Sequence, residues 1–126
     1  MRDMPYAPGL HLLLDLHGAA GLDDAARLQD VLCEAAQAAG ATVLGAAFHP
    51  FPGGGVTGVV LLAESHITIH TWPERAFAAV DIFMCGAARP ELAQAVIAAR
   101  LVPAQSQVTA VPRGQAHMNQ ASQPAL

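Results

Sequence analysis

The chain has 126 residues, of which 53% are hydrophobic and only 13% are charged, and its formal net charge is −4. This length suits one domain with one core, and no apolar run reaches the roughly 18 residues of a membrane span. The arginines stand singly and form no basic patch, which argues against a nucleic-acid partner. So little charge on a small domain predicts that an oligomer covers part of the surface.

Lysine is absent from the sequence. Pyridoxal phosphate needs a lysine to hold it covalently, so amine chemistry with that cofactor is excluded. The two cysteines, Cys33 and Cys85, fit neither a disulfide framework nor a metal-site spacing. The chain also begins without the apolar segment of a secretory signal, and we expect the protein to be cytoplasmic.

The first part of the chain shows a strand pattern and then a helix pattern. Residues 9–17 indicate a mostly buried strand, and residues 22–40 indicate an amphipathic helix with acidic residues at its start and Gly40 just after its end. Cys33 lies beside the apolar stripe of this helix and is interpreted as a small core or flank residue. The expected stripe consists of Leu28, Val31, Leu32, Ala35 and Ala39.

The rest of the chain predicts five more strands and a second helix. The expected strands span 42–51, 56–63, 66–71, 77–83 and 107–112, and the expected helix spans 90–101. This order predicts a two-layer α/β (α+β) sandwich with helices on one face of a mainly antiparallel sheet. We expect a single domain over residues 1–113 and a polar, disordered tail over 114–126.

The chain is organised around residues 61–74, followed closely by residues 78–86, and the first of these overlaps an apolar run from Val56 to Trp72. This run is rich in Val, Ile, Leu and Thr, yet it is much longer than the 5 or 6 residues or so of an ordinary strand, so a break is expected inside it. The polar triplet Glu64-Ser65-His66 is the place for that break. A bend there exposes the Ser65 hydroxyl and strains its backbone, although a serine between strands is most often only a turn residue.

Two other uses of these residues are disfavoured. His66 and His70 have the His-x-x-x-His spacing of a helical zinc site, but in a strand they lie about 13 Å apart, so one metal cannot bridge them and no metal is expected. A Ser-His-acid hydrolase at Ser65 lacks the Gly-x-Ser-x-Gly elbow and an oxyanion loop. His11 and His17 have no reactive neighbour in the sequence and are interpreted as structural.

Two sequence strings near the centre point to a known family. Residues 64–74 read Glu-Ser-His-Ile-Thr-Ile-His-Thr-Trp-Pro-Glu, and residues 78–86 read Ala-Ala-Val-Asp-Ile-Phe-Met-Cys-Gly. Together they closely resemble the prokaryotic S-adenosylmethionine decarboxylase proenzymes, and the resemblance extends over about residues 9–113. It implies the same two-layer fold and a chain that cuts itself between Glu64 and Ser65. The products are then a β chain of residues 1–64 and an α chain of residues 65–126 that begins with a pyruvoyl group made from Ser65.

The resemblance also implies roles for residues around the cut. In that family the serine hydroxyl attacks the preceding carbonyl to form an ester, which needs an oxyanion donor and a base for the serine α-proton. These processing roles fall on His70 and Thr57, where threonine keeps the hydroxyl of the more common serine. Cys85 corresponds to the residue that donates the proton to the product carbon. Its structural interpretation is a buried thiol at the end of a strand. The pyruvoyl ketone forms a Schiff base with the substrate and provides the electron sink that the missing lysine cannot.

Substrate recognition falls on two further residues. The resemblance places Phe51 where an aromatic ring stacks on the adenine and attracts the sulfonium, and Glu74 where a carboxylate bonds the ribose hydroxyls. Each also has a purely structural interpretation. The chain departs from the family in Pro52-Gly-Gly after Phe51 and in Arg75-Ala-Phe77 after Glu74, which bears on the shape of the pocket and not on the chemistry.

The resemblance therefore implies an S-adenosylmethionine decarboxylase that serves spermidine synthesis, as a homodimer of processed protomers with sites at or near the interface. Two alternatives stay open. One is a pyruvoyl-dependent ornithine or arginine decarboxylase of the same family, which a panel of substrates separates. The other is an unprocessed, non-enzymatic homologue that only binds its ligand, and it predicts a chain that stays uncut.

Overall fold

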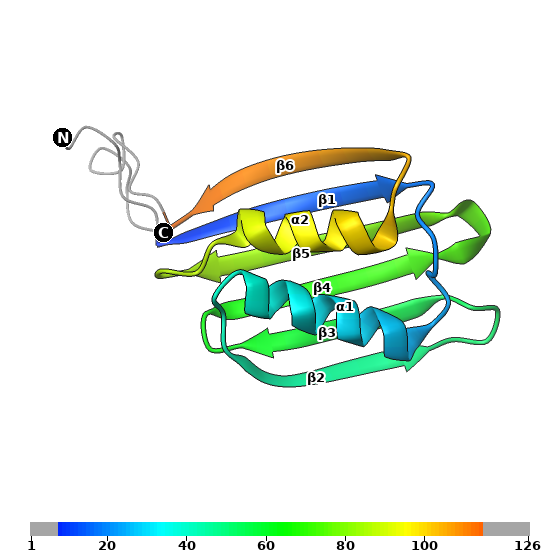
Figure 1. Ribbon diagram of the computed structural model, residues 1–126, viewed down its shortest axis with the longest axis horizontal. Helices are drawn as coiled ribbons and strands as arrows, with labels where there is room; N and C mark the ends of the chain where they lie inside the picture. Colours follow the sequence, from blue (N-terminus) through cyan, green and yellow to red (C-terminus); the bar gives the residue numbers. More distant parts are fainter. Residues whose placement is uncertain (1–7, 115–126) are drawn as a thin grey trace, which may run out of the picture.

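In the computed structural model, residues 8–114 form one six-stranded sheet with two helices on one face (Figure 1). The strands are β1 (Gly9–His17), β2 (Val43–Pro50), β3 (Val56–Leu62), β4 (Ser65–Trp72), β5 (Phe77–Cys85) and β6 (Gln105–Arg113); the helices are α1 (Ala25–Ala38) and α2 (Pro90–Leu101), and a 3-10 turn, η1 (Pro73–Arg75), precedes β5. The two-layer sandwich expected from the sequence is confirmed. The tail expected from residue 114 onward lies, after Gly114, outside the described residues.

The strands lie in the order β2-β3-β4-β5-β1-β6, and every neighbouring pair is antiparallel. From β1 the chain crosses over three strands through α1 to reach β2, and from β5 it crosses over β1 through α2 to reach β6. Each helix therefore joins two strands that run in the same direction. This explains why a strand-helix-strand pattern occurs twice in a mainly antiparallel protein.

The core lies between the helices and one face of the sheet. Successive residues of a strand point to opposite faces, and in β4 this places Ile67, Ile69 and Thr71 in the core. The five residues of the expected helical stripe are all buried. Asp24 caps α1 by accepting a hydrogen bond from the Arg27 backbone N–H at 3.1 Å, and Gly40 follows the helix end with φ of 80°.

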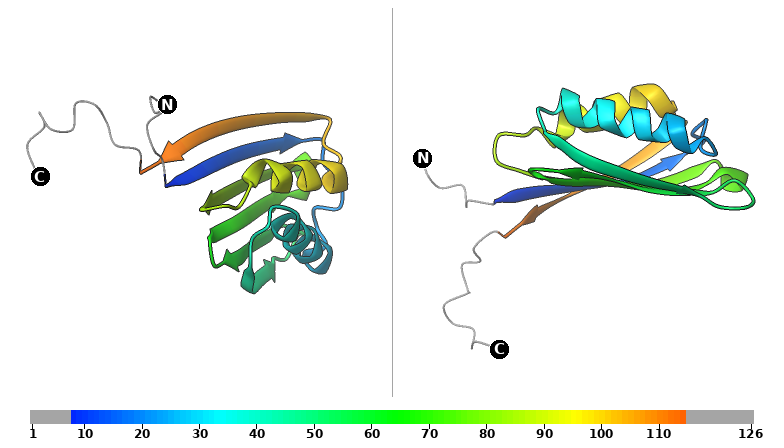
Figure 2. Two further views of the ribbon diagram at one scale, coloured as in Figure 1. Left: turned by 60° about the vertical axis from the view of Figure 1, so that its left-hand side comes forward. Right: turned by 90° about the horizontal axis from the view of Figure 1, so that it is seen from below.

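The opposite face of the sheet, which we call the open face, is covered by no element of residues 8–114 (Figure 2). Large apolar side chains nevertheless lie on it: Leu13, Leu61 and Trp72 are 41%, 53% and 41% exposed. Neither of the described helices has the length and apolarity needed to cross a membrane.

Several element boundaries differ from the sequence prediction by one to three residues, and two strands show why. Strand β4 begins at Ser65 itself, because Ser65 pairs with both Leu62 and Met84. Strand β6 has nine residues because it pairs with β1 along its whole length, from Gly9 opposite Arg113 to His17 opposite Gln105. An edge strand with exposed side chains carries no alternating apolar pattern, so its first residues read as a loop.

Candidate active site

The predicted bend is a tight turn of two residues, Ala63 and Glu64, between β3 and β4. Directly after it, Ser65 has φ of 151°, a backbone angle that residues with a side chain seldom adopt. A residue held in such a region costs about 1–3 kcal/mol and persists only where its surroundings enforce it. The strain expected at Ser65 is therefore present in the uncut chain.

The peptide bond before Ser65 is in contact with Cys85. Met84 of β5 pairs with Ser65, so the next residue, Cys85, lies opposite Glu64. Its thiol donates a hydrogen bond to the Glu64 carbonyl oxygen at 3.1 Å. This carbonyl thus has the Ser65 hydroxyl on the next residue and a donor at its oxygen, which is the arrangement that attack on a carbonyl requires.

Thr57 and His70 form a second group on the open face. They are direct partners across β3 and β4, and the Thr57 Oγ1 lies 3.2 Å from the His70 Nδ1. His70 follows Ser65 by five residues on the same strand, which corresponds to about 16 Å at 3.3 Å per residue. Within one protomer the two groups are therefore too far apart to act on each other.

A pocket of about 400 Å³ lies beside the second group, and its walls include Phe51, Thr57, His70, Trp72 and Glu74. Ser65 and Cys85 are not part of its lining. The structure thus brings both predicted substrate-binding residues together with both predicted processing residues. All four lie apart from Ser65 and Cys85, next to the predicted cleavage site.

Phe51 lies at the rim of this pocket and is 49% exposed. Its backbone N–H donates to the Gly55 carbonyl at 2.7 Å, which closes a tight loop in which Gly53 and Gly54 have φ of 98° and 106°. Glycine adopts such angles without steric cost. The Pro52-Gly-Gly sequence that departs from the family pattern is therefore the segment that presents Phe51.

A cluster of titratable side chains from three neighbouring strands lies elsewhere on the open face. His11 Nε2 of β1 lies 2.6 Å from Asp81 Oδ2 of β5, and His66 Nε2 of β4 lies 3.3 Å from the same oxygen. Thr68 donates to the other oxygen of Asp81, and Arg113 lies 3.0 Å from the His11 Nδ1. The candidate ligand atoms of the two histidines and Asp81 lie within 4.8 Å of one another, close enough for the three to hold a metal ion.

Hydrogen bonding accounts for the cluster without further groups. An arginine can only donate, so the His11 Nδ1 accepts from Arg113 and the His11 Nε2 carries the proton that it donates to Asp81. Burial alone raises the pKa of Asp81, but the hydrogen bonds from Thr68, His11 and His66 outweigh it and hold this pKa below its ordinary value.

This cluster was not predicted from the sequence, in which His11 was interpreted as structural. His11 and Asp81 are 70 residues apart in the chain and meet only through the pairing of β1 with β5. The available signal was the alternation in β4, which places His66 and Thr68 on one face. His66 and His70 share that face and make separate contacts, with Asp81 and Thr57.

Both cysteines are free thiols. Cys33 is partly buried and packs against the core, as predicted. Burial, and then the negative charge of Asp30, raise the pKa of the Cys33 thiol above its ordinary value, which keeps it protonated and unreactive. Cys85 is exposed and is the thiol at the Glu64–Ser65 bond.

Comparison with known proteins identifies the family. The family model of S-adenosylmethionine decarboxylase matches residues 10–114. The S-adenosylmethionine decarboxylase proenzyme of Thermodesulfovibrio yellowstonii is 48% identical over 91 residues, which are 70% of this chain and 67% of that protein. The proenzyme of Methanococcus maripaludis is 42% identical over 109 residues, which are 84% and 89% of the two chains.

The same relationship holds for a solved structure. The crystal structure of the adenosylmethionine decarboxylase from Aquifex aeolicus matches with a TM-score of 0.77 and 35% identity, over 89% of this chain and 95% of that chain. The resemblance expected from the residues around Ser65 is confirmed, and the chain belongs to the S-adenosylmethionine decarboxylase family.

Proposed function

We propose that this chain is a self-processing, pyruvoyl-dependent decarboxylase that converts S-adenosylmethionine to decarboxylated S-adenosylmethionine (S-adenosylmethioninamine) and CO2 for spermidine synthesis. The observation that carries the proposal is the Glu64–Ser65 peptide bond, where a serine with φ of 151° follows a carbonyl that accepts a hydrogen bond from a thiol. Family membership supports S-adenosylmethionine as the substrate over ornithine or arginine.

Self-cleavage starts at Ser65. The Ser65 Oγ attacks the Glu64 carbonyl carbon, and Cys85, 3.1 Å from the carbonyl oxygen, donates to the oxyanion that develops there. The strain at Ser65 is released when the peptide becomes an ester, which lowers the barrier. Removal of the Ser65 α-proton then breaks the bond between the Ser65 Cβ and the ester oxygen, and Glu64 leaves as a carboxylate. One water hydrolyses the remaining imine, which releases ammonia and leaves the pyruvoyl group.

The base for these proton transfers is the Thr57–His70 pair, in which the hydroxyl lies 3.2 Å from the imidazole. Because this pair lies about 16 Å from Ser65 in its own chain, a second copy must bring it to the cut. The open face, with its exposed Leu13, Leu61 and Trp72, is the surface on which that copy docks. We therefore propose a homodimer in which each site combines Ser65 and Cys85 of one protomer with Thr57 and His70 of its partner.

In the mature enzyme a pyruvoyl group at position 65 would supply a ketone able to condense with the substrate amine and to accept the electrons of the bond that loses CO2. The chain contributes the surroundings of this group. Cys85 holds its proton at Sγ beside the start of β4 and delivers it to the product carbon. No lysine and no metal enters this scheme.

Substrate binding falls to the pocket of about 400 Å³. Phe51 offers a half-exposed ring for stacking on the adenine, and the aromatic faces of Phe51 and Trp72 attract the sulfonium cation. Glu74 on the same wall accepts hydrogen bonds from the ribose hydroxyls. The two free cysteines suit the reducing cytoplasm, where we place the enzyme.

Intact mass under denaturing conditions tests the proposal. The expected result is two fragments, 1–64 and 65–126, of which the second has no free α-amine, together with CO2 release from carboxyl-labelled S-adenosylmethionine. Release from ornithine or arginine instead would assign the enzyme to the alternative substrates. A chain that stays uncut on incubation would overturn the proposal in favour of a homologue that only binds.

A further inference from the structure

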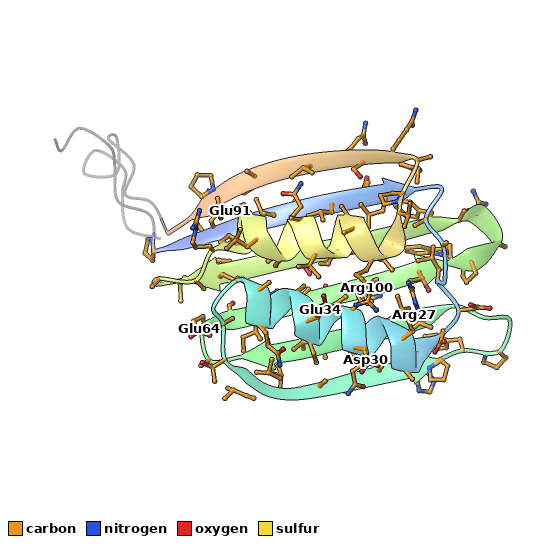
Figure 3. The ribbon with its side chains drawn as sticks, viewed as in Figure 1. Arg27, Asp30, Glu34, Glu64, Glu91 and Arg100 are labelled. Carbon is orange, nitrogen blue, oxygen red and sulfur yellow. The ribbon has the colours of Figure 1, made fainter. Side chains whose placement is uncertain are left out.

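The turn that precedes Ser65 is tied to a distant part of the chain through Glu64. The Glu64 carboxylate accepts a hydrogen bond from the Thr42 backbone N–H at 2.9 Å, and the Ala63 N–H donates to the Thr42 carbonyl at 2.9 Å. Thr42 lies in the connection between α1 and β2, beside which Glu64 projects (Figure 3). The turn is therefore held at both of its residues by one residue from outside the hairpin.

This tie has a consequence for the backbone. Hairpins with two-residue turns favour turn types in which the first or both turn residues have positive φ. Ala63 and Glu64 do not adopt positive φ, whereas Ser65, the first residue of the following strand, has φ of 151°. The unfavourable angle thus falls on the residue whose hydroxyl must attack, and not on the turn.

Glu64 is fixed at a second point as well. Its carbonyl oxygen accepts from Cys85 at 3.1 Å while its carboxylate accepts from Thr42. Two contacts on one residue, one through the side chain and one through the main chain, define the orientation of the carbonyl plane. Loss of the side-chain contact frees the turn to relax towards a preferred type and to carry the carbonyl away from Cys85.

We infer that Glu64 is a positioning residue for self-cleavage. Its carboxylate holds the Glu64 carbonyl against Cys85 and keeps the backbone strain of the turn at Ser65. The inference rests on the proposed self-processing. In the step concerned, the Ser65 Oγ bonds to the Glu64 carbonyl carbon and gives its proton to the base. The C–N bond breaks and the freed nitrogen takes up a proton, so the amide becomes an ester with no atom gained or lost.

Three substitutions of Glu64 separate reach from charge. Glu64→Gln keeps an acceptor oxygen at the same distance, so it is expected to cut within about threefold of the wild-type rate. The small loss arises because a neutral hydrogen bond is only about half as strong as a charge-assisted one. Glu64→Asp keeps the charge but is one methylene shorter, and Glu64→Ala has no acceptor. Both slow the cut at least about tenfold, or about 1.4 kcal/mol in the barrier.

The rates are measured on the full chain, from the fraction uncut by denaturing mass spectrometry at timed intervals after cell-free synthesis. Hydroxylamine added at each time traps the ester and reports how much of it has formed. Glu34→Ala is the matched control, because Glu34 is also an exposed carboxylate that accepts from another element, here Arg100 of α2, and it should leave the rate unchanged. Urea unfolding of each variant reports on the fold.

The outcomes distinguish this inference from the function on which it rests. Slow Asp and Ala variants with a rescued Gln variant support it. A fast Asp variant with a slow Gln variant shows that charge and not reach matters. Rates equal to wild type in all three variants show that the tie is irrelevant, and three equally slow variants show that an acceptor oxygen at the right reach does not suffice. Each of these results overturns the inference, while wild-type cleavage upholds the proposed function. A wild-type chain that is never cleaved would contradict the proposed self-processing function itself.

Discussion

At the scale of single residues, the backbone of Ser65 is the feature that distinguishes it from an ordinary turn serine. Its φ of 151° occurs where Ser65 pairs with Leu62 and Met84, directly after a two-residue turn. A side chain in this position is retained at the expense of stability, and such sites concentrate where chemistry takes place.

Removing the hydroxyl in two ways tests that strain. Ser65→Ala and Ser65→Gly both leave an uncut chain, but only glycine adopts φ of 151° without a steric penalty. The glycine variant is therefore expected to be more stable than the alanine variant by about 1 kcal/mol. Urea unfolding of the two uncut proteins measures the difference, and equal midpoints would contradict the strain.

Asp81 gives a prediction in pH. Its pKa is held below the ordinary value in the folded state, so it contributes stability above its unfolded pKa of about 3.9 and loses it as pH falls through the folded value. Asp81→Asn is expected to be less stable than wild type at pH 7. The gap should shrink below about pH 4, where the wild-type carboxylate takes up its proton. Thermal unfolding across pH 3–7 checks this, and a gap that stays constant would mean that ionisation of Asp81 is irrelevant.

Residues of the candidate site were predictable where they are close in sequence. The position of the strained serine follows from the length of the apolar run around Glu64-Ser65-His66. The contact of Cys85 with the Glu64 carbonyl depends on the register between β4 and β5, and the His11–Asp81 contact depends on β1 lying next to β5. Neither register nor strand order can be read from local patterns.

At the scale of elements, close packing between β2 and β3 shapes the sheet edge next to the pocket. Phe48 of β2 lies directly opposite Gly58 of β3, and a Cβ added at Gly58 would lie only 2.1 Å from ring atoms of Phe48. A side chain at position 58 therefore forces the ring or the strand to move. Thr57 directly precedes Gly58 and lines the pocket, so a movement of the strand at position 58 also displaces the pocket wall.

Gly58→Ala is accordingly expected to destabilise the fold by about 1–3 kcal/mol, the usual effect of overpacking. Gly45→Ala in the neighbouring strand is the control, because a Cβ there meets no atom within 4 Å. It should change the free energy of unfolding by less than about 0.5 kcal/mol. Comparable losses in both variants would show that glycine is needed in these strands for another reason.

The elements themselves differ in how well the sequence foretold them. Helix α2 begins at Pro90 and ends at Leu101 as expected, because proline marks a first turn and apolar spacing marks the buried face. Strand β6 was expected to be shorter, because its Gln and Ser residues are exposed and its hydrogen bonds to β1 alone define it. Patterning reports burial, so an element that buries little leaves no pattern.

At the scale of the whole molecule, the proposed division of the site between two protomers can be tested by mixing defective chains. Ser65→Ala supplies an intact Thr57–His70 pair, and His70→Ala supplies an intact Ser65. Neither is expected to cut alone, but co-expressed with distinguishable tags they form mixed dimers in which only the His70→Ala chain is cut. Denaturing mass spectrometry identifies the cut chain.

A second mixture is the control for that experiment. Thr57→Ala and His70→Ala damage the same half of the site, whose two members lie 3.2 Å apart, so their mixed dimers contain no complete site. No rescue is expected from this pair. Rescue in both mixtures, or in neither, would contradict a site shared between protomers.

The distance along β4 between Ser65 and His70 also bears on when the enzyme becomes active in a growing cell. On the proposed arrangement a newly made chain cannot mature alone and must first encounter another. Maturation then rises more steeply than synthesis, because it depends on collisions between copies. On this arrangement the cell would accumulate dormant protein at low expression and gain activity only as the pool fills, so the dosage of the gene would set the delay before decarboxylation starts.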